Sequence, residues 1–209
     1  MAKKTGNINA QQIFNVLRND NVLFLLVLSN ILIVFVYAHM DTSLVQYLSK
    51  SGMSDVIELI STLLLVNALT IIFLQFAILK MMQSRKLIEK IYLGVFFVAI
   101  SQIGLAINPI DWFWGWLCSI FILSIGECIL FPSMNIYLDR IAPNEMKGLY
   151  FGVATLYSIG FVVAPFFGGV ILDLFNGPTL FTLTFLICLL VGYLYLRLQR
   201  KCELYKVIK

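Results

Sequence analysis

The sequence has few charged residues, a single histidine and no metal-binding arrangement of cysteines. Asp, Glu, Lys and Arg make up 12% of its 209 residues, whereas about 25% is usual for a soluble domain. The one histidine, His39, leaves no second imidazole for a catalytic or metal-binding pair. The sequence also lacks a glycine-rich phosphate loop and a basic, aromatic nucleic-acid surface. We therefore expect no enzyme activity, no cofactor, no metal site and no nucleic-acid partner.

What the sequence has in excess is apolar residues, which form 60% of the chain. A helix that spans a membrane needs about 20 of them in a row, so the chain has room for about six spans. The fold class predicted is an all-α integral membrane protein with six transmembrane helices. The spans are expected at about 22–40, 56–79, 91–107, 112–138, 149–172 and 179–196.

Three segments follow from this division of the chain. Residues 1–21 are expected to form a cytoplasmic N-terminal segment, with a short helix that carries Ile13, Phe14 and Leu17 on one side. Residues 22–198 form the membrane unit, and residues 199–209 a basic cytoplasmic tail. Residues 41–55 are expected to be a polar loop.

The positions of the basic residues predict the orientation. If the N-terminus is cytoplasmic, every lysine and arginine except Lys50 lies on the cytoplasmic side, as the positive-inside rule requires. Both termini are then cytoplasmic, and the protein is expected in a plasma membrane or a bacterial inner membrane. Tryptophans 112, 114 and 116 would anchor the outer face and tyrosines 193 and 195 the inner face. The last span carries few polar groups, so we expect it to face lipid.

Polar residues inside the apolar runs are the candidate proton or substrate site. An ionisable residue at membrane depth is costly, and burial favours the neutral form of a carboxyl group. Glu127, near the middle of its span, is therefore the first candidate to carry a proton; it could instead be a structural, hydrogen-bonded carboxyl group. The amides Asn67 and Gln75 lie eight residues apart on one helix face. The remaining candidates are Asn30 and Asn135.

Two further groups are candidates for gating. His39 and Asp41 lie at the expected outer end of the first span. They are either ordinary polar residues at the membrane interface or part of an outer gate. Because residues two apart point to different sides of a helix, we do not expect them to pair. The fifth span carries small residues that allow close packing, and a proline that can kink a helix. These are Gly160, Ala164, Pro165, Gly168 and Gly169.

One stretch of the chain contains Gly126-Glu127, Pro132, Asp139, Ala142-Pro143 and Lys147-Gly148. It resembles the tenth and eleventh helices, and the turn between them, of a major facilitator superfamily transporter of the drug-efflux-like group. The chain as a whole resembles the C-terminal six-helix half of such a transporter. The order Gly160-x3-Ala164-Pro165-x2-Gly168-Gly169 is similar to the G-x3-G-P-x2-G-G motif of proton-driven antiporters. Here Ala164 replaces a glycine, and the family places that motif in its fifth helix.

The resemblance implies secondary transport of a small molecule, coupled to protons and directed outward. It also implies a second six-helix half, supplied by a homodimer or by a separately encoded chain, because the family places its substrate site between two halves. A truncated or split gene product is the other explanation for a half. The spacing Glu127-x4-Pro132 also resembles the proton-coupled peptide carriers, where that glutamate meets the substrate amine. A non-transporting membrane partner of a full carrier is the remaining alternative.

Overall fold

Every element in the described part of the chain is a helix. The structure, a computed structural model, describes residues 16, 18 and 20–208, and the side chains of these up to Cys202. The helix expected around Ile13, Phe14 and Leu17 lies outside the described residues. The elements are α2 (Asn21–Asp41), α3 (Ser43–Ser49), α4 (Val56–Met81), α5 (Leu87–Ile107), α6 (Phe113–Ile141), α7 (Lys147–Ala154), the 3₁₀ helix η1 (Thr155–Tyr157), α8 (Ser158–Leu174) and α9 (Gly177–Ile208).

The six predicted spans are confirmed. Among the described residues, six helical stretches are long and apolar enough to cross a membrane: α2 with α3, α4, α5, α6, α7 with α8, and α9. A helix satisfies its own backbone hydrogen bonds, so long apolar runs in a hydrocarbon environment adopt this form. Polar residues define several of the ends. Asp20 caps α2 by accepting from the amides of Val22 and Leu23, and Asn176 accepts from the amide of Thr179 at the start of α9.

Two local features differ from the sequence prediction. Residues 41–55 are not a continuous loop, because α3 continues the line of α2 after a break at Thr42. The fifth span is interrupted at η1, eight residues before Pro165, and α8 remains helical through that proline. A short 3₁₀ segment inside a helix tightens one turn and changes the direction of the side chains that follow.

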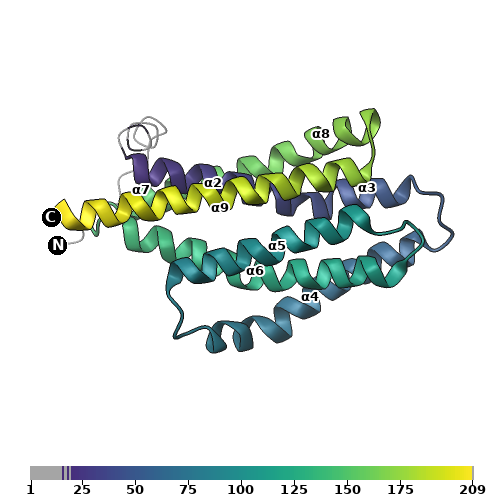
Figure 1. Ribbon diagram of the computed structural model, residues 1–209, viewed down its shortest axis with the longest axis horizontal. Coiled ribbons are helices and arrows are strands. Elements are labelled where there is room, and N and C mark those ends of the chain that lie inside the picture. Colours follow the sequence, from purple (N-terminus) through teal and green to yellow (C-terminus); the bar gives the residue numbers. More distant parts are fainter. Residues whose placement is uncertain (1–15, 17, 19, 209) are drawn as a thin grey trace.

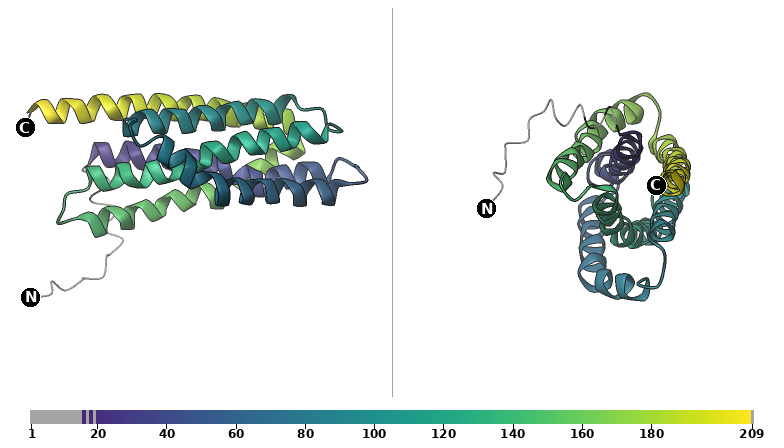
Figure 2. Two further views of the ribbon diagram at one scale, coloured as in Figure 1. Left: turned by 90° about the horizontal axis from the view of Figure 1, so that it is seen from below. Right: turned by 90° about the vertical axis from the view of Figure 1, so that its left-hand side faces the viewer.

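Helix α2 lies at the centre of the bundle. It packs against α8 and α9, and it also touches α6. Helix α5 packs between α6 and α9, while α4 packs mainly on α6. As a result, α4 and the α7–α8 pair lie at opposite margins of the bundle (Figures 1 and 2).

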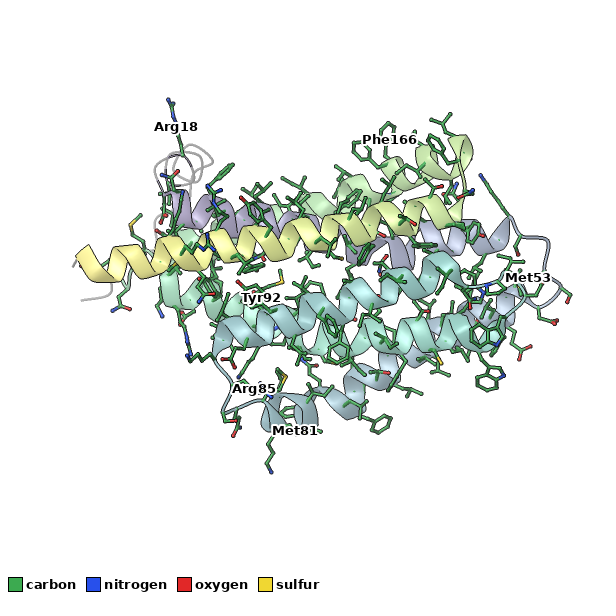
Figure 3. The ribbon with its side chains drawn as sticks, viewed as in Figure 1. Arg18, Met53, Met81, Arg85, Tyr92 and Phe166 are labelled. Carbon is green, nitrogen blue, oxygen red and sulfur yellow. The ribbon has the colours of Figure 1, made fainter. Side chains whose placement is uncertain are left out.

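The two ends of the bundle differ in charge. The start of α2 and the end of α9 lie together (Figure 1), as an even number of spans requires. Arg18 and Arg85 lie at that end, and Met53 lies at the opposite end (Figure 3). Which end is cytoplasmic stays a prediction: by the positive-inside rule we expect it to be the end with the arginines.

The expectation that α9 faces lipid with a tyrosine anchor is wrong in part. Tyr195 is fully buried, as are Phe181 and Cys188 on the same helix. Trp116, expected as an outer anchor, is also fully buried, and its indole nitrogen donates to the carbonyl oxygen of Ile110. The helices with the most exposed apolar side chains are instead α4 and α8. Phe76 on α4 is 87% exposed and Phe166 on α8 is 69% exposed; Phe166 projects away from the bundle in Figure 3.

Candidate functional site

A carboxyl group, an amide and a hydroxyl group meet between α4 and α6. The amide nitrogen Nδ2 of Asn67 donates to Oε2 of Glu127 at 2.8 Å and to Oγ of Ser124 at 3.0 Å. The Ser124 hydroxyl donates to the carbonyl oxygen of Ile120 at 2.8 Å, so its oxygen is free to accept from Asn67. Both hydrogens of the amide are therefore used, and we name these three residues the Glu127 cluster.

The positions of these residues in their helices place the cluster close to the middle of the membrane. Glu127 is the central residue of α6, which runs from Phe113 to Ile141. Asn67 lies beside the middle of α4, which runs from Val56 to Met81. Ser124 precedes Glu127 by three residues, a spacing that puts two side chains on one helix face.

Close packing on the other side of α6 turns Glu127 toward α4. Gly126 is buried, and a Cβ atom there would lie 3.0 Å from the carbonyl oxygen of Gly94 and 2.9 Å from a methyl group of Val98 on α5. The missing side chain thus allows α6 to approach α5 closely. The next residue, Glu127, then points away from that contact and reaches Asn67.

Tyr37 is a member of this site that the sequence analysis missed. Its hydroxyl group lies near Glu127 and Asn67. Its ring packs edge-on against Phe131 of α6, with 5.3 Å between the ring centroids. The sequence offers no distinctive signal for it, because a tyrosine inside an apolar span is common.

The hydrogen-bond partners of the Glu127 carboxyl group, the Asn67 amide and the Tyr37 hydroxyl, are neutral. The ion pairs among the described residues join Lys50 to Asp173 and Lys147 to Asp139, both at the ends of spans. Glu127 is part of neither pair. A carboxyl group with neutral partners at this depth can bind a proton or a cation without first breaking an ion pair.

The other polar candidates lie outside the cluster. Asn30 is fully buried and its Oδ1 accepts from the Tyr195 hydroxyl of α9; Tyr157 of η1 lies near it. Gln75 is part-exposed, two turns beyond Asn67 on α4, and Asn135 is exposed, two turns beyond Glu127 on α6. The structure thus brings Glu127 and Asn67 together, and leaves Asn30, Gln75 and Asn135 in other places.

The two outer gate candidates point to different surroundings. His39 is only 1% exposed; its Nδ1 lies 2.8 Å from Oγ of Ser43, and its ring packs edge-on against Phe35. Asp41 is exposed. Consistent with their helical spacing, no hydrogen bond or ion pair between these two side chains is present in the described structure.

The small residues of α8 divide into a packed face and an open one. Gly160, Ala164 and Gly168 are buried on the face toward α2, whereas Pro165 is exposed and Gly169 part-exposed. A Cβ atom at Gly160 would collide with the carbonyl oxygen of Ile31 and would lie 2.7 Å from the amide nitrogen of Phe35. The stripe brings α8 and α2 into backbone contact, as small-residue stripes do in membrane helices.

Comparison with known proteins identifies the family. The profile described as Major Facilitator Superfamily matches residues 2–158. The chain is 28% identical over 175 residues to the uncharacterized MFS-type transporter YqjV of Bacillus subtilis (strain 168), covering 83% of this chain and 42% of that protein. It is 26% identical over 199 residues to the uncharacterized MFS-type transporter YdeE of Escherichia coli (strain K12), covering 94% of this chain and 49% of that protein.

A shorter match covers 34% of the chain. It is 33% identical over 75 residues to a protein of Planococcus maritimus named Na(+), Li(+), K(+)/H(+) antiporter, and covers 18% of that protein. The chain thus spans about half or less of the length of the curated relatives it matches. The family profile covers more than half of the sequence, and the part of the chain that the structure describes has six helical stretches of membrane-spanning length, so the chain belongs to the Major Facilitator Superfamily of membrane transporters.

Proposed function

We propose that the chain is the C-terminal six-helix half of a secondary transporter that exports a small molecule in exchange for protons, with Glu127 as its proton site. The observation that carries the proposal is the hydrogen bond between Asn67 and Glu127 near the middle of the membrane. The carboxyl group is part-exposed and its hydrogen-bond partners are neutral, so it can gain and lose a proton without leaving a basic residue unpaired.

The cluster suggests where the proton would bind. Asn67 donates to Oε2 of Glu127, and this oxygen can accept that hydrogen bond in both protonation states. The proton would therefore be carried by Oε1. Ser124 holds the second hydrogen of the same amide, which keeps Asn67 in one orientation. In this mechanism Asn67 and Ser124 position the carboxyl group, and Glu127 alone changes its charge.

Two observations support exchange with protons over other coupling. The stripe Gly160, Ala164, Gly168 resembles part of the motif of proton-driven antiporters. One relative, over 75 residues, is named as an antiporter of Na⁺, Li⁺ or K⁺ against H⁺. We extend this name to the present chain only as a hypothesis, in which alkali cations are one of the substrate classes to test.

A second six-helix unit is part of the proposal. Asn135 is exposed and Glu127 part-exposed on α6, and polar groups facing hydrocarbon are costly. Halves of this family are parallel repeats around a shared site. A second copy of this chain, or a separately encoded half, would therefore cover this face without inverting either unit. On this hypothesis the monomer does not transport.

The test uses the chain purified with any partner that accompanies it and reconstituted into vesicles that contain a trapped pH-sensitive dye. A pH gradient is imposed, and NaCl, LiCl, KCl, the lipophilic cation ethidium or the dipeptide Ala-Ala is then added. We expect one of these to dissipate the gradient in the native protein, and Glu127→Gln to abolish the response. Glu58→Gln, which neutralises an exposed carboxylate at the start of α4, is the matched control and should keep it.

The outcomes separate the alternatives. Proton-coupled flux in Glu127→Gln at the native rate would contradict the role of Glu127. A response to Ala-Ala alone would favour the peptide-carrier alternative. Specific binding to a full carrier without flux of its own would favour a non-transporting partner. Measuring molecular mass and flux together across a dilution series tests the assembly, since flux proportional to a monomer would refute the two-unit requirement.

A further inference from the structure

Asp41 is a carboxyl group inside the first span, although the sequence placed it at the end of that span. Because α3 continues the line of α2, the span runs from Asn21 to Ser49 as one stretch, and Asp41 lies eight residues before its end. Eight residues of helix rise by roughly 12 Å. The Asp41 side chain is exposed. At this depth an exposed carboxylate requires a water-filled cavity or protein beside it, and not lipid.

Asp41 shares one face of α2 with Tyr37, because the two residues are one helical turn apart. The Tyr37 ring packs against Phe131 of α6, so this face is directed toward α6. The negative charge of Asp41 acts on the Tyr37 hydroxyl group and on Glu127. The three ionisable side chains therefore lie together where α2 meets α6.

The neighbours of Asp41 show its height relative to the Glu127 cluster. Met40, the residue before it, lines a small apolar gap together with Leu63 of α4. Leu63 precedes Asn67 by one helical turn, a rise of roughly 6 Å, in the direction of the loop between α3 and α4. Asp41 thus lies about one turn nearer to that loop than the hydrogen bond between Asn67 and Glu127. In the predicted orientation, this is the outer side of the cluster.

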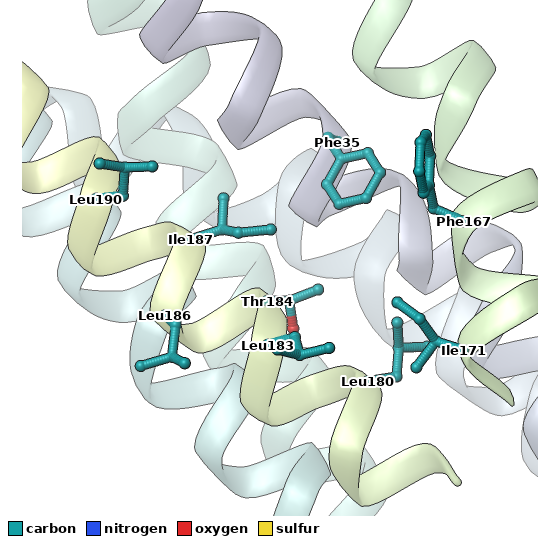
Figure 4. Close-up of a pocket in the computed structure, with 9 residues that line it drawn as sticks. All are labelled: Phe35, Phe167, Ile171, Leu180, Leu183, Thr184, Leu186, Ile187 and Leu190. Atoms are coloured by element: carbon teal, nitrogen blue, oxygen red, sulfur yellow. The ribbon is translucent and has the colours of Figure 1, made fainter. Parts of the chain in front are cut away.

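The opposite face of α2 offers no comparable groups. Phe35, two residues before Tyr37, points to that side, where it lines an apolar cavity of about 400 Å³ together with side chains of α8 and α9 (Figure 4). Thr184 has the one polar side chain among the residues that line this cavity, and its hydroxyl group donates to Gln102. A proton that crosses the outer half of this bundle is therefore better served by the face with Tyr37 and Asp41.

No basic residue is paired with Asp41 in the described structure, since it takes part in neither ion pair. Apart from Tyr37 and Glu127, the ionisable groups of the neighbouring helices lie elsewhere. The Tyr47 ring of α3 packs against α6 and α9, and Glu58 is exposed at the start of α4. Asp41 can therefore bind and release a proton without breaking an ion pair.

We propose that Asp41 is the entry point for protons on their way to Glu127, with the Tyr37 hydroxyl group between them. The inference rests on the proposed role of Glu127 as the proton site. A proton from the outer water binds the Asp41 carboxylate. The Tyr37 hydroxyl group then releases its proton to the Glu127 carboxylate, while the phenol oxygen takes up the proton that Asp41 releases, directly or through one water molecule.

The transfer is balanced and has a direction. One proton has moved from Asp41 to Glu127, Asp41 is again a carboxylate, and the phenol of Tyr37 is unchanged. Glu127 is thereby loaded from the outer side, as export in exchange for entering protons requires. Asp41 and Tyr37 thus determine how fast Glu127 gains its proton, and Glu127 determines whether the proton is held.

The experiment follows protonation of Glu127 directly and needs no transport substrate. Right-side-out membrane vesicles are prepared from cells that express the native protein with any partner it has, and light releases protons from a caged compound outside. Time-resolved infrared difference spectra record the carbonyl stretching band of protonated carboxyl groups. The band that Glu127→Gln removes belongs to Glu127.

Four variants separate the proton route from effects on the fold. Asp41→Asn and Tyr37→Phe should each slow the rise of the Glu127 band several-fold and leave its final amplitude unchanged. Asp41→Glu, which keeps a carboxyl group, should recover most of the rate. Asp55→Asn is the matched control, because Asp55 is an exposed acidic residue in the loop before α4, and it should keep the native rate. Added formate, a small weak acid, should restore the rate in Asp41→Asn.

The outcomes distinguish this inference from the proposed function. A native rate in folded Asp41→Asn or Tyr37→Phe, with the Glu127 band present, would overturn the route and leave the role of Glu127 intact. Equal slowing by Asp55→Asn, or slowing in Asp41→Asn that formate does not relieve, would also overturn it. If Asp41→Asn fails to fold, Tyr37→Phe decides. If Glu127→Gln removes no band, Glu127 is not the proton site, and the proposed function fails together with the route.

Discussion

The amide of Asn67 on α4 donates a 2.8 Å hydrogen bond to the Glu127 carboxyl group on α6, across sixty residues of sequence. The same amide nitrogen donates to Ser124, so one side chain satisfies two acceptors in the middle of the membrane. The pair therefore serves two purposes: it fixes the orientation of a carboxyl group, and it joins α4, the helix at the margin of the bundle, to α6.

The first prediction concerns this amide. Asn67→Ala removes the donor to both acceptors, and we expect it to lower the apparent melting temperature of the purified protein. Leaving a buried acceptor unpaired costs about 1–3 kcal/mol, although the part-exposed carboxyl group will recover some of this cost from solvent. Thermal unfolding in detergent measures the loss.

Asn135→Ala is the matched control for that experiment. Asn135 is the same residue type, is exposed on α6 and lies outside the cluster, so its replacement should leave the melting temperature within error. Equal losses for the two variants would show that the hydrogen bonds of Asn67 do not stabilise the fold.

The second prediction concerns Tyr195. Its buried hydroxyl group donates to Asn30, so Tyr195→Phe should destabilise the protein by about 1–3 kcal/mol, the cost of an unpaired buried acceptor. Tyr193→Phe removes a hydroxyl group from a side chain that is 51% exposed on the same helix. A lower melting temperature for Tyr195→Phe alone is expected. A larger loss for Tyr193→Phe would contradict the assignment.

The spans could be predicted because a helix that crosses hydrocarbon must consist mostly of apolar residues. About 20 apolar residues are needed for each span, and the charged turns separate them. The short elements could not be predicted in the same way. The break at Thr155–Tyr157 and the helix Ser43–Ser49 depend on packing against α2, which leaves no distinctive composition in the sequence.

The sequence shows which polar residues are candidates for the site, but not which of them contact each other in the fold. Glu127 and Asn67 stand out as polar groups in apolar runs, yet periodicity gives only the face of a helix and not its neighbour. For that reason Asn30 and Glu127 were placed together as candidates although Asn30 binds Tyr195 on α9. Tyr37 was missed because a tyrosine in an apolar span is ordinary until its hydroxyl group is found beside a carboxyl group.

The third prediction concerns orientation. In a background in which Cys118, Cys128 and Cys188 are replaced by serine, Ser49→Cys should react with an impermeant thiol reagent applied to intact cells. Cys202, at the end of the bundle with most of the lysines and arginines, should react only after the cells are made permeable. If Cys202 is labelled in intact cells, in a variant that retains Ser49, the predicted membrane orientation is wrong.

The last prediction concerns the contact between α2 and α8. Gly160→Ala adds a methyl group that would collide with the backbone at Ile31 and Phe35, and backbone atoms cannot rotate away as a side chain can. Overpacking of this kind costs about 1–3 kcal/mol.

Gly169→Ala in the same helix is the matched control, because its new methyl group would lie 3.8 Å from Gln46, an ordinary contact distance. Since alanine favours helices more than glycine does by about 1 kcal/mol, the control should be neutral or slightly stabilising. Melting temperatures in detergent should therefore fall for Gly160→Ala and hold or rise for Gly169→Ala. If both variants gain stability, α8 does not pack against α2 at backbone distance, and the small residues would then have to be explained by movement of α8 instead of by packing.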